Sequence, residues 1–124
     1  MEIREHTVSL DLALELRDAG YPQENALFYW YRQEEYYGAG VLQPAGEPFL
    51  DRYEAEPSFP IKRLAAAPLA SELGEVLPDK FKSRKLGPAW WCWMPNDSAS
   101  SVRAVTEPNA RAEMWLHLRK ASLI

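Results

Sequence analysis

The sequence holds few of the residues from which metal sites and disulfide frameworks are built. Its 124 residues include one cysteine and two histidines. A disulfide needs two cysteines, so Cys92 cannot form one within the chain, and its tryptophan neighbours predict a small, buried apolar residue. His6 and His117 lie near opposite ends of the chain, and neither has a cysteine or histidine partner at the spacing of metal ligands. The sequence therefore predicts neither a metal nor a cofactor.

The chain also lacks an excess of positive charge. Its formal net charge is −4. It has no overall basic field with which to displace counterions from a nucleic-acid backbone, so nucleic acid is not an expected partner. The one basic stretch, residues 80–85 (Lys-Phe-Lys-Ser-Arg-Lys), is expected to be a solvated loop after a helix.

Sequence motifs of the common enzyme classes are missing as well. The six glycines are scattered among turns, and no phosphate loop, nucleophile elbow or dinucleotide fingerprint occurs. Two acidic pairs, residues 34–35 and Glu72 with Glu75, could serve acid–base chemistry, but such pairs are more often solvated surface. The protein is therefore predicted not to be an enzyme and to have no catalytic residues.

Long apolar segments are the last of the missing features. No apolar run approaches the length needed to span a membrane, and residues 1–6 contain no apolar signal region. A cytoplasmic protein with no membrane partner is therefore expected.

The most distinctive stretch that is present is residues 89–94, Ala-Trp-Trp-Cys-Trp-Met. It holds three of the five tryptophans and is bounded by glycine and proline. A short aromatic run between turn residues predicts a strand. Neither side of this strand is polar, so each needs cover from helices, from a partner chain or from a ligand. Alternation along the strand defines two sides, formed by Trp90, Cys92 and Met94 and by Ala89, Trp91 and Trp93.

Periodicity, capping residues and proline positions predict three helices, at residues 10–19, 68–77 and 106–121. Ser9 and Thr106 are expected to cap the first and last helices, and Gly20 to end the first in a left-handed conformation. Aromatic and β-branched runs predict strands. These strands cover residues 26–32, 41–42, 89–94 and 102–105, with a further brief strand at 61–64.

The order of the main elements is α-β-β-α-β-β-α. It predicts an α+β fold in which three helices pack on one small antiparallel sheet of about four strands. A single domain is expected over residues 1–124, with a proline-rich irregular excursion at 43–60. Six residues are predicted to bury together against the sheet: Leu12, Leu16, Leu69, Leu73, Met114 and Leu118.

Three stretches carry a resemblance to known proteins. Residues 8–30 begin Val-Ser-Leu-Asp-Leu-Ala and end Phe-Tyr-Trp, residues 66–78 begin Ala-Ala-Pro-Leu-Ala-Ser-Glu-Leu, and residues 109–116 read Asn-Ala-Arg-Ala-Glu-Met-Trp-Leu. In this order they resemble a group of small uncharacterised proteins encoded by phages and prophages. The resemblance implies a viral or prophage origin, hence the host cytoplasm as the location, and a helix-plus-sheet fold. It implies no catalytic motif and no ligand.

Aromatic residues near arginines form the strongest functional pattern. Indole faces could stack a base while a guanidinium group holds phosphate. The candidate guanidinium groups are those of Arg32, Arg63, Arg84 and Arg103. Tryptophan, tyrosine and arginine also concentrate at the anchors of protein interfaces. Strand aromatics in a small domain, however, most often only pack in the core.

These patterns lead to the hypothesis of a non-enzymatic binding protein. A protein–protein interaction is expected first, either with a second copy in a homodimer or with a host protein. The alternative is a sponge that sequesters a small nucleotide-like signalling ligand. In the hypothetical binding surface, Trp30 and Arg32 of the early strand join Trp91 and Trp93 of the late strand on one face of the sheet.

Overall fold

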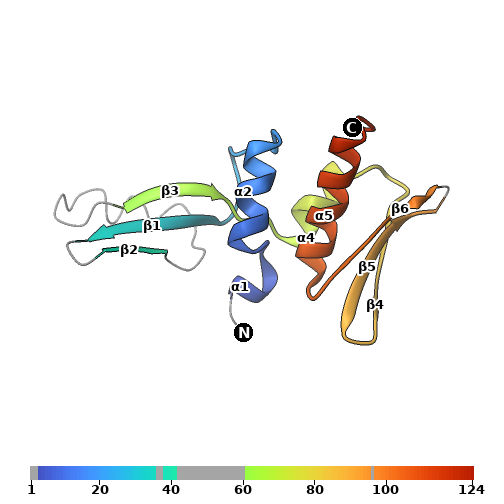
Figure 1. The fold of residues 1–124 in the computed structure, drawn as a ribbon, viewed down its shortest axis with the longest axis horizontal. Helices are drawn as coiled ribbons and strands as arrows, with labels where there is room; N and C mark the ends of the chain where they lie inside the picture. Colours follow the sequence, from blue (N-terminus) through green and yellow to red (C-terminus); the bar gives the residue numbers. More distant parts are fainter. Residues whose placement is uncertain (1–2, 36–37, 42–60, 96) are drawn as a thin grey trace.

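The structure is a computed structural model that describes residues 3–35, 38–41, 61–95 and 97–124 (Figure 1). The predicted excursion at 43–60 lies outside the described residues. The helices are α1 (Ile3–His6), α2 (Leu10–Asp18), α4 (Ala70–Val76) and α5 (Glu107–Lys120). The strands are β1 (Tyr29–Glu35), β2 (Gly38–Val41), β3 (Ile61–Ala66), β4 (Lys82–Leu86), β5 (Ala89–Met94) and β6 (Asp97–Ala104).

The mixed helix-and-sheet character is confirmed, but the prediction of one four-stranded sheet is wrong. The strands form two antiparallel sheets of three strands each, in the orders β2-β1-β3 and β4-β5-β6. Figure 1 shows the helices between the two sheets. The early strands, β1 and β2, are therefore separated by helices from the late strands, β5 and β6. Strand β3 completes the first sheet, and β4 completes the second.

Strand β4 accounts for the additional strand in the second sheet. The basic stretch was expected to be a loop, but Lys82–Leu86 pairs along its whole length with β5. Gly87 has φ of 63° and is followed by Pro88. This matches the positive φ that a type II′ turn requires at its first central residue, so two residues suffice to close the hairpin. The basic side chains of Lys82, Arg84 and Lys85 are exposed, as expected for a solvated stretch.

The helix ends agree largely with the local signals. Gly20 has φ of 95°, and the Tyr21 amide donates to the carbonyl of Leu16 at 2.9 Å, which closes α2 in the predicted way. The Thr106 hydroxyl accepts a hydrogen bond from the Asn109 amide at 3.4 Å and caps α5 as predicted. Ser9 occupies the N-cap position of α2, but its side chain makes no capping bond.

Helix α4 is shorter than predicted at both ends. The segment before it is held in an extended conformation, because the Val8 amide donates to the Pro68 carbonyl at 3.0 Å and Thr7 forms an isolated antiparallel bridge with Leu69. Leu69 becomes the N-cap residue, with ψ of 162°. The amino-terminal segment is thereby tied to the start of α4.

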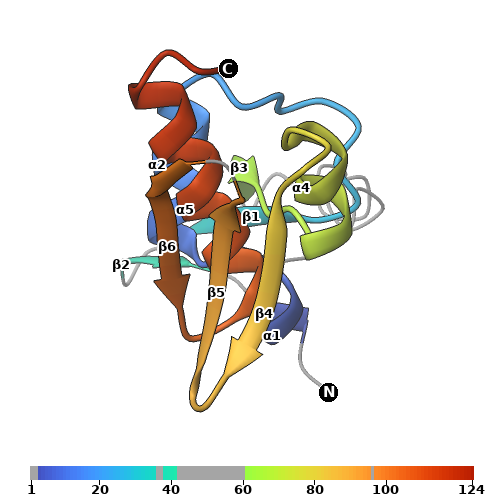
Figure 2. The same ribbon diagram turned by 90° about the vertical axis from the view of Figure 1, so that its right-hand side faces the viewer.

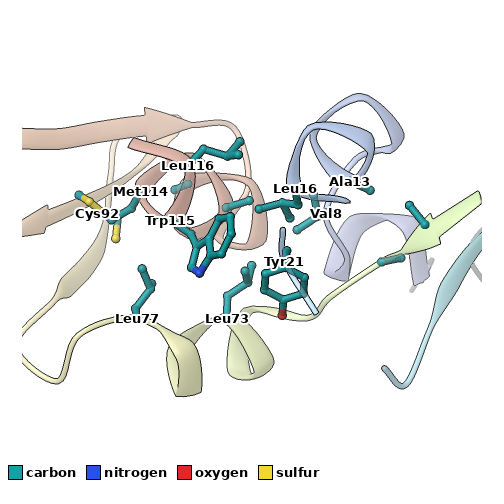
Figure 3. Packing of buried hydrophobic residues seen from close by; sticks show 14 of the residues in the cluster. Val8, Ala13, Leu16, Tyr21, Leu73, Leu77, Cys92, Met114, Trp115 and Leu116 are labelled. Carbon is teal, nitrogen blue, oxygen red and sulfur yellow. The ribbon is translucent and has the colours of Figure 1, made fainter. Parts of the chain in front are cut away.

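The core is built around α5. One side of α5 packs on β4, β5 and β6, while α2 and α4 pack on its other sides. Figure 3 shows Trp115 of α5 near Tyr21 and Leu73, with Met114 and Cys92 toward the β4-β5-β6 sheet. Of the six predicted core residues, two are only half-buried, Leu12 and Leu69. The other four are confirmed as buried: Leu16, Leu73, Met114 and Leu118. Among the helices of the described ranges, none has the length and apolar character needed to cross a membrane.

Candidate binding face on the β4-β5-β6 sheet

Strand β5 directs its side chains to two different environments. Cys92 is 0% exposed in the core, and its neighbours by alternation, Trp90 and Met94, pack against the same core. Because successive side chains of a strand point to opposite faces, Trp91 and Trp93 point away from α5. Two of the three tryptophans of this strand therefore lie on the outer face of the sheet.

The pairing of the strands shows what surrounds these two tryptophans. Trp91 lies opposite Arg84 of β4 and Arg103 of β6, and Trp93 lies opposite Lys82 and Ser101. Directly paired residues share a face of the sheet. The Cζ atom of Arg103 lies 5.7 Å from the centroid of the Trp91 ring, which is a cation–π contact. These six residues, Lys82, Arg84, Trp91, Trp93, Ser101 and Arg103, are called the basic aromatic face below.

The basic aromatic face is open in the part of the chain that the structure describes. Figure 2 looks onto the outer side of β4, β5 and β6, with α5 behind them and no described helix or strand in front. Lys82, Arg84 and Arg103 are exposed, and Trp91 and Trp93 are half-buried. Within the described residues, α5 covers the inner side of the tryptophan strand, and no helix or strand covers its outer side.

The charged side chains that the structure describes on this face are all of one sign. Residues 82–86, 89–94 and 100–104 contain no aspartate or glutamate, although the whole chain carries a net charge of −4. Three cations, from Lys82, Arg84 and Arg103, lie beside the two tryptophans on the same face. The chain therefore presents a local positive surface that its net charge conceals.

The inner side of β4 is fixed by a network around Arg111. Its Nη2 donates to the Ser83 hydroxyl and to Glu107 Oε2, both at 3.1 Å, and its Nη1 donates to the Ala70 carbonyl at 2.7 Å. A Cβ atom added at Gly74 would lie 2.7 Å from Nη1, so a larger residue there would force the guanidinium group of Arg111 to shift. Arg111 thus holds β4, α4 and α5 together beneath the face.

Cys92 has the buried structural role expected from the sequence, and His117 contacts a residue of β6. Burial raises the pKa of the Cys92 thiol to about 11, which disfavours the reactive thiolate. His117 Nε2 lies 3.3 Å from the Ser100 hydroxyl, within hydrogen-bond distance. Within the described ranges, no three residues that commonly bind metals gather into a group able to hold an ion.

The structure separates the four residues of the hypothetical binding surface. Trp30 belongs to the other sheet and is 8% exposed, and its indole Nε1 donates to the Val8 carbonyl at 3.0 Å. The backbone of Arg32 pairs with Lys62 and Val41, and its side chain lies outside the described residues. One joint surface is therefore not formed, because β1 and β5 lie in different sheets. Trp91 and Trp93 do share a face.

The four arginines singled out from the sequence divide in the same way. Arg84 and Arg103 flank Trp91, whereas the Cζ atom of Arg63 lies 4.5 Å from the ring centroid of Tyr29 in the other sheet. Lys82 was missed as a partner of the tryptophans. The sequence showed that Lys82 belongs to a basic stretch, but it did not show that Lys82 pairs with Trp93 of β5.

A hollow of about 650 Å³ lies at the end of the same sheet. It is bounded by α1, the start of α4 and the start of α5, and its lining includes Trp90, Val105, Glu5 and Glu107. Val105 is 80% exposed. Trp90 reaches this hollow from the inner side of β5, so the three tryptophans of the strand have different surroundings.

Comparisons with known proteins add no identification. No family model matches the chain, and no curated protein and no solved structure matches it.

Proposed function

We propose that the protein is a non-enzymatic binding protein and that the basic aromatic face engages an acidic surface of a partner protein. The observation that carries the proposal is the outward placement of Trp91 and Trp93 beside cations from both neighbouring strands. Tryptophan and arginine dominate the energetic centres of protein interfaces. Complementary charge adds specificity and speeds association.

The charges on the face favour a different protein over a second copy as the partner. Two such faces packed together place the lysines and arginines of one copy near those of the other, and like charges in an interface are costly. Self-association in a homodimer remains a prediction, and it requires a contact that avoids this repulsion. If the resemblance to phage proteins reflects common origin, the partner is a host protein.

A nucleotide-like ligand is the second candidate, because Arg103 lies over the ring of Trp91 at 5.7 Å. This pairing offers one aromatic surface for a base and one cation for phosphate. Sites for small molecules are usually concave and enclose most of the ligand. The face is instead the open side of a sheet, so a larger partner fits it better than a mononucleotide.

The shifted pKa values divide into those of two core groups and that of Glu113, whose pKa is raised by burial and by the charge of Glu15, beside a hollow that His117 also lines. The pKa is raised for Tyr21, Cys92 and Glu113, and burial is the largest cause in all three. Catalytic groups are typically shifted by burial together with a specific charge partner in a cleft. Tyr21 and Cys92 lie among the core residues that pack around α5. Their shifts follow from packing and support no assignment as acid or base.

The proposal is tested by affinity purification of the tagged protein from cells of its source. We expect wild type to retain a partner protein that the Trp91→Ala/Trp93→Ala double variant loses. The matched control is Leu123→Ala, since Leu123 is an apolar residue that is 58% exposed at the carboxyl end of the chain. Equal retention by the double variant and the control contradicts the proposal.

Two further measurements on the same proteins separate the alternatives. Sedimentation equilibrium at tens of micromolar tests the homodimer, which requires a mass above that of the monomer. Titration with mono-, di- and cyclic nucleotides tests the sponge, because a base that stacks on Trp91 quenches its fluorescence. Quenching of wild type but not of Trp91→Phe moves the assignment to the nucleotide ligand.

A further inference from the structure

Among the strands that the structure describes, none pairs with the outer edge of β4, which lies next to the basic aromatic face. In the sheet order β4-β5-β6, β4 pairs with β5 on one side only. Its five residues pair in five consecutive positions without a shift, whereas the pairing of β5 with β6 is interrupted between Trp93 and Met94. An edge strand with regular geometry leaves a row of backbone donors and acceptors available to another chain.

The turn shows which backbone groups point to the free edge. Leu86 and Ala89 flank the two-residue turn and form a pair, and the pair that closes such a turn is hydrogen-bonded. Hydrogen-bonded and non-hydrogen-bonded pairs alternate along an antiparallel ladder. Lys85 and Ser83 are therefore in non-hydrogen-bonded pairs with β5. Their N–H and C=O groups point away from β5.

The side chains of β4 favour an acidic chain as the one that pairs with its free backbone groups. Lys82, Arg84 and Lys85 are exposed, and the strand has no acidic residue and no proline. Lysines on an edge commonly protect a protein from pairing with its own copies. The same charges repel a second β4 strand but attract an acidic one. The basic side chains therefore oppose pairing with a second copy of β4 but not with an acidic strand.

We infer that the partner adds an acidic, extended segment to β4 as a fourth strand, antiparallel to it. This inference rests on the proposed function and names the part of the partner that binds. Backbone hydrogen bonds to Ser83 and Lys85 give affinity, and side chains at alternate positions give specificity, as in other cases of strand addition.

The register of the outer face defines the sequence pattern of that segment. Lys82, Arg84 and Leu86 alternate along β4, with Lys82 and Arg84 beside Trp93 and Trp91, and Leu86 is 49% exposed. In an antiparallel strand the residue opposite Leu86 comes first and is apolar. The residues two and four positions later lie opposite Arg84 and Lys82 and are acidic. The partner motif is apolar-x-acidic-x-acidic.

Substitutions at Lys85 separate strand addition from docking flat on the face. Lys85→Pro removes the outward N–H group while the ladder with β5 is retained, because proline is tolerated at edge positions whose N–H faces solvent. Lys85→Thr is the matched control, since it also removes the charge but keeps the N–H group. Far-UV circular dichroism verifies that both variants are folded.

The experiment is a selection of random peptides displayed against the folded full-length protein. We expect enrichment of the apolar-x-acidic-x-acidic pattern, and the affinity of the selected peptides should fall about tenfold or more in Lys85→Pro relative to Lys85→Thr. Hydrogen exchange provides a readout without substitution, because a bound peptide should protect the Ser83 and Lys85 amides.

Three results overturn the inference. These are a selection that yields no acidic alternation, equal affinity for Lys85→Pro and Lys85→Thr, and a bound peptide that leaves both amides unprotected. Peptides that need Trp91 and Trp93 but bind both Lys85 variants equally would leave the proposed function intact and remove only strand addition. A separate result contradicts the proposed function itself, namely that the Trp91→Ala/Trp93→Ala variant still retains the partner protein in the affinity purification.

Discussion

Replacing Trp115 by alanine is expected to lower the free energy of unfolding by about 3–5 kcal/mol, the usual range for a large aromatic residue in a core. Trp115 is 6% exposed, and its ring meets the ring of Tyr21 edge to face at a centroid distance of 5.4 Å. Alanine removes this contact and leaves a cavity between α5 and the segments packed on it, which are too constrained to collapse completely.

Urea unfolding followed by circular dichroism measures this loss without relying on the fluorescence of the residue removed. The matched control is Trp93→Ala, because Trp93 is half-buried on the outer face. We expect this substitution to lower the free energy of unfolding by about 1 kcal/mol, which is typical of a substitution outside the core. Equal losses for the two variants would contradict the assignment of Trp115 to the core and Trp93 to the surface.

Leu73→Ala is expected to cost about 2–5 kcal/mol through the lost transfer energy and the cavity it leaves. Leu73 is 0% exposed and lies on the face of α4 that packs against α5. Val76 of the same helix is 40% exposed. Val76→Ala therefore serves as the control, with an expected change of about 0.5 kcal/mol or less.

The same urea measurement tests the packing of α4. A loss below about 0.5 kcal/mol for Leu73→Ala would show that this helix does not pack on α5 as described, since full burial of a leucine side chain alone contributes more than that.

The sequence predicted most features that depend on neighbouring residues, although the predicted side-chain cap at Ser9 is not formed. Gly20 ends α2 and Thr106 caps α5, because a left-handed residue or a capping hydroxyl acts within one turn of helix. The tryptophan strand, at residues 89–94, coincides with β5. Its two sides also follow from simple alternation, so the separation of Cys92 from Trp91 and Trp93 was correct before any fold was known.

The arrangement of the strands could not be obtained in this way. Strand pairing joins residues far apart in the sequence. Nothing local indicated that α5 would lie on the sheet of β5, or that Trp30 would enter the core from the other sheet. The basic side chains of β4 concealed a strand, because its apolar support comes from the neighbouring strand and from α5. The sequence therefore identified the two tryptophans of the basic aromatic face. It did not show which cations lie beside them, because that depends on how β4 and β6 pair with β5.

The three tryptophans of β5 illustrate why residue type alone does not assign a role. Trp90 contributes to the core and to the hollow with Glu5 and Glu107, while Trp91 and Trp93 lie among cations. Local charge thus differs between two sides of one strand. The net charge of −4 is a sum over the whole chain and does not show this difference. An expectation about partners that is drawn from the net charge therefore does not apply to the basic aromatic face.

Quenching of tryptophan fluorescence by iodide and by caesium tests most directly whether Trp91 and Trp93 form an open, positively charged face. Arg84 and Arg103 beside Trp91 should concentrate the anion and repel the cation. We expect iodide to quench wild type strongly, and the Trp91→Phe/Trp93→Phe variant to lose most of this quenching while caesium quenching changes little. Equal quenching of wild type by the two ions, or iodide quenching that persists in the variant, would contradict the existence of the basic aromatic face.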